Sequence, residues 1–208
     1  MFGIRYRRLG LVVYWALLLL FAGVFLKLAE DVYQHEGFAL DRPVLAWLEA
    51  QQSPALTILM KGLTCLGSAA ILGPLTLLLI VWLGMRKAWR EMAFLALSVG
   101  GAAFLNLGAK YFFARPRPGL FPQVVPEQDF GFPSGHAMGS AAFFLALFLL
   151  CRRSAPGLAL WVGGLGLLLT SAVSFSRLYL QVHYPSDVLA GLALGAAWVL
   201  GSSRLLRL

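Results

Sequence analysis

The chain has 208 residues, of which 60% are hydrophobic and only 12% are charged, and its mean hydropathy is +0.78. A water-soluble globule of this composition would have too few polar side chains to cover its surface, so the composition excludes that class and indicates a membrane protein. The net charge of +8 is compatible with nucleic-acid binding, but the basic residues sit between hydrophobic runs and form no basic stripe, which argues against a nucleic-acid partner.

Six stretches without Asp, Glu, Lys or Arg approach the length of about 20 mostly apolar residues that a membrane span needs. They lack the alternation of barrel strands, and a helix satisfies its own backbone hydrogen bonds in lipid, so we expect an all-α bundle of six membrane-spanning helices. No polar or Pro/Gly/Ser-rich linker divides the chain, which predicts a single membrane-embedded domain over residues 1–208. The stretches are 9–26, 62–85, 92–109, 130–151, 154–176 and 188–203.

The longest connection, residues 29–61, follows the first stretch. Within it, Asp41, Arg42 and Pro43 precede an apolar pattern, which predicts a capped, short helix at the membrane interface. In the later stretches, glycine and alanine recur, as in 100–103 and 191–195, and small residues of this kind let neighbouring helices approach closely.

The loops predict the orientation of the bundle. Lys and Arg accumulate in cytoplasmic loops, and six crossings place most basic loop residues on one side, so we expect both termini in the cytoplasm. Four further cations, Lys110, Arg115, Arg117 and Arg177, fall on the opposite side, where cations are disfavoured, and they call for a functional explanation. The orientation rests on Arg5, Arg7, Arg8, Arg86, Lys87, Arg90, Arg152, Arg153, Arg204 and Arg207.

The first polar segment on the outer side runs from Lys110 to Pro118, at the end of the third stretch. Its two prolines favour extended backbone around Arg115 and Arg117, which holds the guanidinium groups outside the helix. Arginine forks match phosphate oxygens two at a time, and lysine adds a compact positive charge. The alternative is a basic cluster that only ends the helix and extends to the interface.

The second segment, Phe132 to His136, starts the fourth stretch. Ser134 is placed to cap a helix whose free amide groups and positive dipole end face outward, and such a terminus binds anions. Gly135 lets a ligand approach the backbone, and His136 lies where it could give a proton to a leaving oxygen. The alternative is an ordinary serine cap beside an interfacial histidine.

The third segment, Ser176 to Asp187, joins the last two stretches. Pro185 suits the first turn of a helix, which puts Asp187 about one turn from His183 and close enough to accept a hydrogen bond from its imidazole. The other ring nitrogen would then be free to attack phosphorus. A carboxylate in the first turn is also a common capping choice, but Arg177 lies just beyond an apolar run on the face where cations are disfavoured.

Together, these segments resemble the three-part signature of the type 2 phosphatidic acid phosphatase family. The order and the spacing both match, and the signature spans residues 110–187. The three patterns are Lys110-x6-Arg117-Pro118, Pro133-Ser134-Gly135-His136 and Ser176-Arg177-x5-His183-x3-Asp187.

The resemblance implies a role for each motif residue. His183 would be the nucleophile that forms a phosphohistidine, Asp187 would orient it, and His136 would protonate the leaving group and then activate water. Arg115 lies outside the strict pattern and would be an accessory cation. The residues that would hold the phosphate are Lys110, Arg117, Ser134, Gly135 and Arg177.

Members of this family hydrolyse lipid phosphates and pyrophosphates, including phosphatidylglycerophosphate, phosphatidic acid, undecaprenyl pyrophosphate and lipid A. The resemblance therefore implies a lipid phosphatase without a metal or other cofactor, with its site on the outer face of a bacterial cytoplasmic membrane. The compact size of the chain and its external site resemble those of the bacterial phosphatidylglycerophosphatase B and undecaprenyl-pyrophosphatase group. The sequence also lacks the paired outer carboxylates of a magnesium site, since Glu127 and Asp129 have no convincing partner set.

Two alternatives stay open at this point. A phosphotransferase of the same scaffold would pass the phosphoryl group to a second lipid in place of water. A transporter or other anion-binding membrane protein would use the cations for recognition only, although the adjacent histidines favour chemistry. The sequence does not discriminate among the lipid substrates, and it does not predict the oligomeric state.

Overall fold

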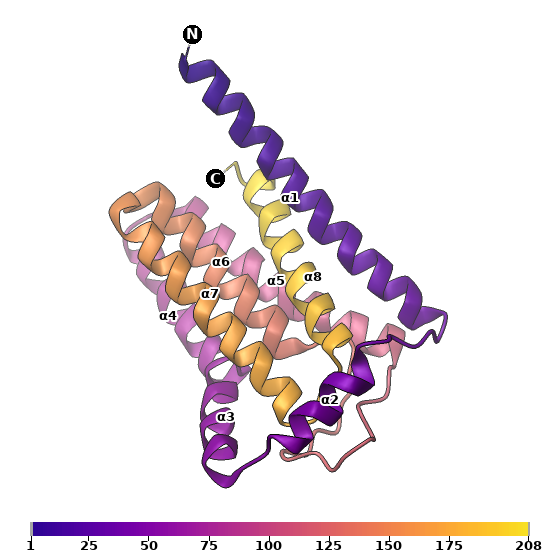
Figure 1. The fold of residues 1–208 in the computed structure, drawn as a ribbon. Coiled ribbons are helices and arrows are strands. Elements are labelled where there is room, and N and C mark those ends of the chain that lie inside the picture. The colour runs from indigo at the N-terminus through magenta and orange to yellow at the C-terminus, as the bar shows by residue number, and fades with distance from the viewer. Residues whose placement is uncertain (1, 208) are drawn as a thin grey trace.

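In the computed structural model, residues 2–207 are described, and they form eight helices and no strand. The chain is therefore all-helical, as predicted (Figure 1). The helices are α1 (Phe2–Tyr33), α2 (Asp41–Ala50), α3 (Pro54–Leu66), α4 (Ala69–Met85), α5 (Trp89–Phe113), α6 (Gly135–Ser154), α7 (Pro156–Tyr179) and α8 (Pro185–Leu205).

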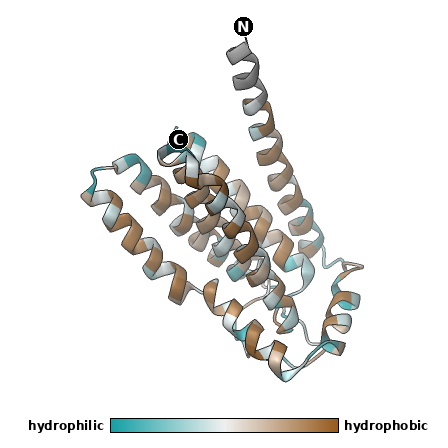
Figure 2. Cartoon of the chain, turned by 60° about the vertical axis from the view of Figure 1, so that its left-hand side comes forward, coloured by the Kyte–Doolittle hydropathy of each residue, from teal (hydrophilic) through white to brown (hydrophobic). Residues whose placement is uncertain are grey.

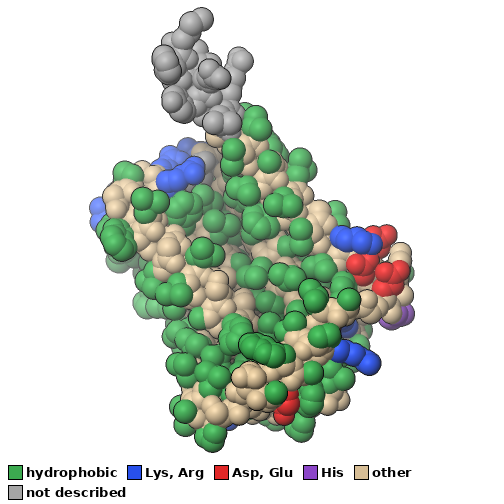
Figure 3. Space-filling view, viewed as in Figure 1, with side chains coloured by type: hydrophobic (Ala, Val, Ile, Leu, Met, Phe, Trp, Pro, Cys, Tyr) green, Lys and Arg blue, Asp and Glu red, His purple; other side chains and the backbone are tan. Residues whose placement is uncertain are grey.

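Six segments of the described chain are long and apolar enough to cross a membrane, which confirms the predicted six-span bundle. Hydrophobic residues dominate the long helices, and hydrophilic residues gather toward their ends and connections (Figure 2). The outer surface is also largely hydrophobic, with large exposed side chains such as Leu160 and Trp161 (Figure 3). Water would not stabilise a surface of this kind, whereas lipid would, so the chain is an integral membrane protein.

The second span consists of two helices, α3 and α4, which are separated by Gly67 and Ser68. The sequence-based start of this span, residue 62, was too late. The helix begins at Pro54 because Ser53 caps it, with its hydroxyl accepting a hydrogen bond from the Leu56 amide. The break between α3 and α4 lies beside the cavity described below, where Gly67 is a lining residue.

The short helix α2 crosses the end of the bundle and contacts α7 and α8 (Figure 1). Its existence was predicted, but its cap was not as expected. The residue before the helix is Leu40, which makes no capping bond, and Asp41 is buried inside the first turn. Its carboxylate is turned toward α8, where it accepts hydrogen bonds from Ser186.

Helix α6 packs against α5, α7 and α8, and its contact with α8 is especially close. A Cβ atom added at Gly191 would lie 2.5 Å from the Ser134 carbonyl oxygen, and one added at Gly195 would lie 2.8 Å from that of Met138. A larger residue at either position would push the helices apart, which confirms the role predicted for small residues here. The Ser134 amide accordingly reaches the Asp187 carbonyl oxygen at 3.0 Å.

The first turn of α1 and the last turn of α8 lie at the same end of the bundle, away from α2 (Figure 1). At this end Arg90 donates a hydrogen bond to the Leu206 carbonyl, and Arg153 lies 3.7 Å from Glu91. The basic residues at the start of α5 and at the ends of α6 and α8 therefore gather on one side of the bundle. The side chains of Arg5, Arg7 and Arg8, which the orientation also used, lie outside the described residues.

Candidate active site

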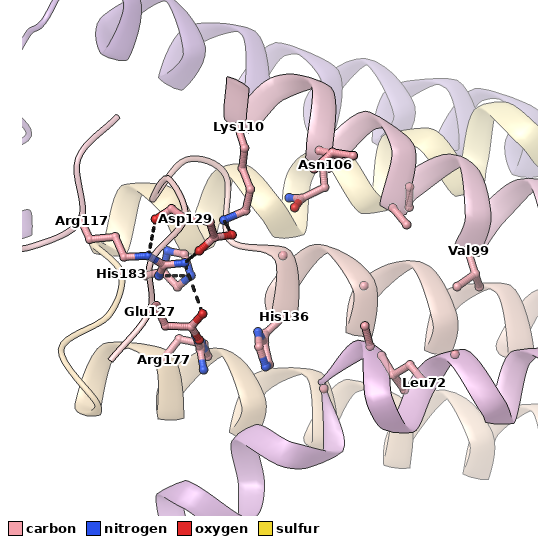
Figure 4. Close-up of a pocket in the computed structure, with 18 residues that line it drawn as sticks. Leu72, Val99, Asn106, Lys110, Arg117, Glu127, Asp129, His136, Arg177 and His183 are labelled. Atoms are coloured by element: carbon pink, nitrogen blue, oxygen red, sulfur yellow. Dashed lines mark hydrogen bonds and ion pairs between the residues drawn. The ribbon is translucent and has the colours of Figure 1, made fainter. Parts of the chain in front are cut away.

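The three motif segments meet at the end of the bundle that α2 crosses. Lys110 lies in the last turn of α5, Arg117 in the α5–α6 connection, and His136 in the first turn of α6. Arg177 lies in the last turn of α7, and His183 follows in the α7–α8 connection. All five side chains line one cavity of about 430 Å³ (Figure 4).

This cavity has a polar end and an apolar end (Figure 4). The cations and histidines gather at one end, and Leu72 of α4 and Val99 of α5 line the other. The apolar part is bounded by small and aliphatic residues of three helices, and no charged side chain among the described residues lines it. The remaining lining residues there are Ala69, Gly73, Ala102, Ala103, Leu107 and Gly139. A charged headgroup and the start of a hydrocarbon chain can therefore share one continuous space.

Ser134 and Gly135 lie where the sequence predicted them, at the start of α6, but the predicted serine cap does not form. The Ser134 hydroxyl is buried and has no hydrogen-bond partner among the described residues, and the Ser134 backbone amide donates to the Asp187 carbonyl oxygen. Gly135 lines the cavity, and a Cβ atom there would lie 3.0 Å from the Asn106 amide oxygen. The first-turn amides of α6 thus donate no hydrogen bond to the serine side chain.

His183 is buried, and its two ring nitrogens face different partners. The Nη1 atom of Arg117 lies 3.2 Å from Nε2. A guanidinium can only donate, so Nε2 accepts and the neutral ring carries its proton on Nδ1. Nδ1 lies 3.6 Å from Oδ2 of Asp187, which is too long for the predicted hydrogen bond. That oxygen already accepts the Tyr184 amide at 2.9 Å.

Electrostatics favour the neutral form of His183. Burial lowers the pKa of His183 well below its usual value, and the positive charges of Arg117 and Arg177 lower it further. A neutral imidazole with its lone pair on Nε2, at the cavity wall, is the state that a histidine nucleophile requires.

The cations of the cavity are paired with two carboxylates from the α5–α6 connection. Asp129 lies 2.6 Å from Lys110 and also pairs with Arg117, and Glu127 pairs with Arg177. Burial alone would raise the pKa of Asp129, but hydrogen bonds from Lys110 and Arg117 outweigh it and lower the pKa to about 2. The Asp129 carboxylate is therefore ionised, and an incoming phosphate would compete with Asp129 and Glu127 for the same donors.

Sequence reasoning missed this pairing of Glu127 and Asp129. The two carboxylates lie ten and twelve residues beyond Arg117, and nothing in the local pattern joins them to it. Within the described part of the chain, no group of three or more His, Cys, Asp or Glu side chains gathers as a metal site.

Two further polar residues of the site were also missed. Asn106, one turn before Lys110, lines the cavity and donates a hydrogen bond to the Pro133 carbonyl at 3.2 Å. Thr64 of α3 accepts a hydrogen bond from Arg177 at 2.8 Å. An amide side chain inside an apolar span was a usable signal for Asn106 because polar groups are costly there. Thr64 carried no such signal, since threonine is common in membrane helices.

Arg115 and Asp187 lie behind the cavity and are not part of its lining. The Arg115 guanidinium pairs with Asp187 and, at 2.9 Å, with Asp41. Asp187 is thereby held between Arg115 and the Tyr184 amide, and its second oxygen faces His183. The accessory cation predicted from the sequence thus points at carboxylates of the protein.

Comparison with known proteins identifies the family. The sequence profile of the PAP2 superfamily matches residues 91–207, more than half of the chain. The chain belongs to this superfamily. Phosphatidylglycerophosphatase B of Bacillus subtilis is 33% identical over 82% of this chain and 85% of its own length. Undecaprenyl-diphosphatase of Sulfolobus acidocaldarius is 32% identical over 91% of this chain and 86% of its own length.

A solved structure supports the same assignment at the level of the fold. The crystal structure of the transmembrane PAP2 type phosphatidylglycerolphosphate phosphatase from Bacillus subtilis matches with a TM-score of 0.79 at 29% identity, covering 90% of this chain and 94% of that chain. Membership of the PAP2 superfamily confirms the family resemblance found in the motifs. The chain is a phosphatase embedded in the membrane.

Proposed function

We propose that this PAP2 enzyme hydrolyses the phosphomonoester or pyrophosphate headgroup of a membrane lipid through a phosphohistidine formed on His183. The observation that carries the proposal is the single cavity in which two imidazoles and three cations meet an apolar wall. Positive charge and directed donors around the transferring group are the main requirement of phosphoryl transfer.

The reaction has two steps. Nε2 of His183 attacks phosphorus as the bond to the leaving oxygen breaks, and His136 gives that oxygen its proton. His136 then accepts a proton from water, whose oxygen attacks phosphorus and breaks the P–N bond, which releases phosphate and restores His183. Lys110, Arg117 and Arg177 stabilise the nonbridging oxygens in both steps, once phosphate has displaced Glu127 and Asp129.

The three cations supply the charge that a divalent metal would bring to phosphate, so we propose a reaction that needs no metal. Phosphate release should persist in excess EDTA. Complete loss in EDTA, with recovery on adding magnesium, would contradict this part of the mechanism.

A lipid substrate is supported by the apolar end of the cavity, which can receive a hydrocarbon chain below a bound headgroup. The names of the relatives suggest phosphatidylglycerophosphate and undecaprenyl pyrophosphate, and phosphatidic acid is a third candidate. We place the site at the outer face of the bacterial cytoplasmic membrane, with both termini cytoplasmic, because the basic loops gather at the opposite end of the bundle. We further propose that residues 1–208 act as one catalytic domain.

The test is a panel of phosphate-release assays on the purified full chain in detergent, using the three lipids with and without EDTA. We expect release from at least one lipid. Transfer of the phosphoryl group to a second lipid, without release of free phosphate, would favour the phosphotransferase. Binding of the lipids without any release, by protein shown to be folded, would contradict hydrolysis and favour the anion-binding alternative.

A further inference from the structure

Behind the catalytic cavity, Arg115 lies between two buried carboxylates. Its Nη2 atom is 2.9 Å from Oδ2 of Asp41, and its Nη1 atom pairs with Oδ1 of Asp187. The side chains are 15%, 6% and 0% exposed for Arg115, Asp41 and Asp187 respectively. Buried charges are costly unless each is paired and hydrogen-bonded, so an arrangement of this kind fixes the relative positions of its members.

Asp41 also caps α8, although it belongs to α2. Its Oδ1 atom accepts the Ser186 amide at 3.0 Å, and its Oδ2 atom accepts the Ser186 hydroxyl at 2.6 Å. Ser186 is the second residue of α8, where backbone amides have no partner within the helix and negative charge meets the positive end of the dipole. Arg115 completes the arrangement by donating to the same hydroxyl at 2.8 Å.

This arrangement continues directly to His183. Asp187 follows Ser186 in α8, and its Oδ2 atom accepts the Tyr184 amide and lies 3.6 Å from Nδ1 of His183. The Arg115 guanidinium lies over the Tyr184 ring, 4.6 Å from its centroid, which fixes the neighbour of His183 as well. The position of the Asp187 carboxylate, which faces the His183 ring, is thus set by Asp41 of α2 and by Arg115 of the α5–α6 connection.

We propose that Asp41 and Arg115 are positioning residues, which hold Asp187 and through it the His183 ring without contacting phosphate. The inference rests on the proposed function, because it assigns these residues to the phosphoryl transfer at His183. It also extends the functional part of the chain to α2, since Asp41 lies outside residues 91–207. For Arg115 it replaces a role as phosphate ligand with a role behind the nucleophile.

Steady-state kinetics separate the two roles of Arg115. In Asp41→Asn and in Arg115→Gln, we expect kcat to fall about 10- to 100-fold with KM changed by less than about 2-fold, because ordering of the nucleophile is lost and phosphate contacts are kept. Arg42→Gln is the matched control, since Arg42 is the exposed neighbour of Asp41 and its loss should leave kcat unchanged. A phosphate ligand would instead raise KM.

A double variant with Asp187 tests whether Arg115 acts through Asp187. If Arg115 acts through Asp187, then Arg115→Gln added to Asp187→Asn should lower kcat by less than about 3-fold further. Losses that multiply in the double variant would overturn the proposal, as would an unchanged kcat in folded Asp41→Asn and Arg115→Gln.

A second readout does not depend on turnover. The chain has three histidines, so substitution assigns the ring signal of His183 in ¹³C-histidine NMR. We expect this signal to shift and broaden in Asp41→Asn/Arg115→Gln, to shift less in the milder Ser186→Ala, and to stay in place in Arg42→Gln. An unchanged His183 signal in folded Asp41→Asn/Arg115→Gln and in folded Ser186→Ala would overturn the positioning role. An inactive wild-type enzyme would overturn only the proposed function.

Discussion

The Nδ1 atom of His183 lies 3.6 Å from Oδ2 of Asp187, and both side chains are buried. At this distance the two groups face each other without a hydrogen bond. Formation of a phosphohistidine would place positive charge on the ring, and an N⁺–H donor binds a carboxylate more strongly, at about 2.7–2.9 Å. Catalytic hydrogen bonds are often long before substrate binds. We therefore expect this pair to tighten during the reaction.

The first prediction concerns Asp187. Asp187→Asn keeps the shape of the side chain but removes the charge that would stabilise the phosphohistidine, so kcat should fall by about 100-fold or more with KM nearly unchanged. Phosphate release at saturating lipid measures the effect. Asp31→Asn on α1, which removes a carboxylate that is not part of the cavity lining, should behave as wild type. A wild-type kcat in folded Asp187→Asn would refute the orienting role.

The second prediction concerns pH. Because the pKa of His183 is lowered, the neutral nucleophile persists below pH 6.5, and kcat/KM should be lost only as pH falls through that lowered pKa. Arg117→Gln removes one of the cations that lower it, so the acidic limb should move to higher pH. Comparing both enzymes on one lipid cancels ionisation of the substrate. A limb that stays in place or moves to lower pH would contradict this assignment.

The third prediction concerns the carboxylates that occupy the phosphate donors. Asp129 is 54% exposed, and exposed ion pairs contribute about 0.2–1 kcal/mol, so Asp129→Asn should lower KM by at most about 5-fold. Glu36→Gln, an exposed change outside the site, is the control. If KM rises instead, Asp129 organises Lys110 and Arg117 for the substrate and does not compete with it.

Much of the fold and part of the site follow from local sequence features. Long apolar runs predict spans because lipid demands internally bonded backbone, and the structure confirms six of them. The signature motifs place Lys110, Arg117, His136, Arg177 and His183 on the same side of the bundle, and the structure brings all five to one cavity. These features could be predicted because they depend only on the spacing of residues within one segment or on the side of the membrane where a loop lies.

The remainder depends on contacts between distant segments. The local pattern predicts that Asp41 belongs to a cap of its own helix, but its carboxylate binds Ser186 of α8, 145 positions away in the sequence. Glu127 and Arg177 pair across 50 positions, and neither contact has a period or a spacing that the sequence could reveal. The boundary between α3 and α4 was likewise hidden, because Gly67 and Ser68 lie inside one continuous apolar run.

The most direct measurement of the central claim is capture of the covalent intermediate. Phosphohistidine is labile in acid and survives alkali, so the enzyme is mixed with a ³²P-labelled lipid pyrophosphate and quenched in base. In His136→Gln, the label should stay on His183. The first step still proceeds because the lipid phosphate that leaves needs little help from an acid, but the second step is slow because no base activates the attacking water. His35→Ala, a change in the exposed third histidine, should behave as wild type. We predict label on His183 and none in His183→Ala, and phosphate release at the wild-type rate from folded His183→Ala would contradict the account.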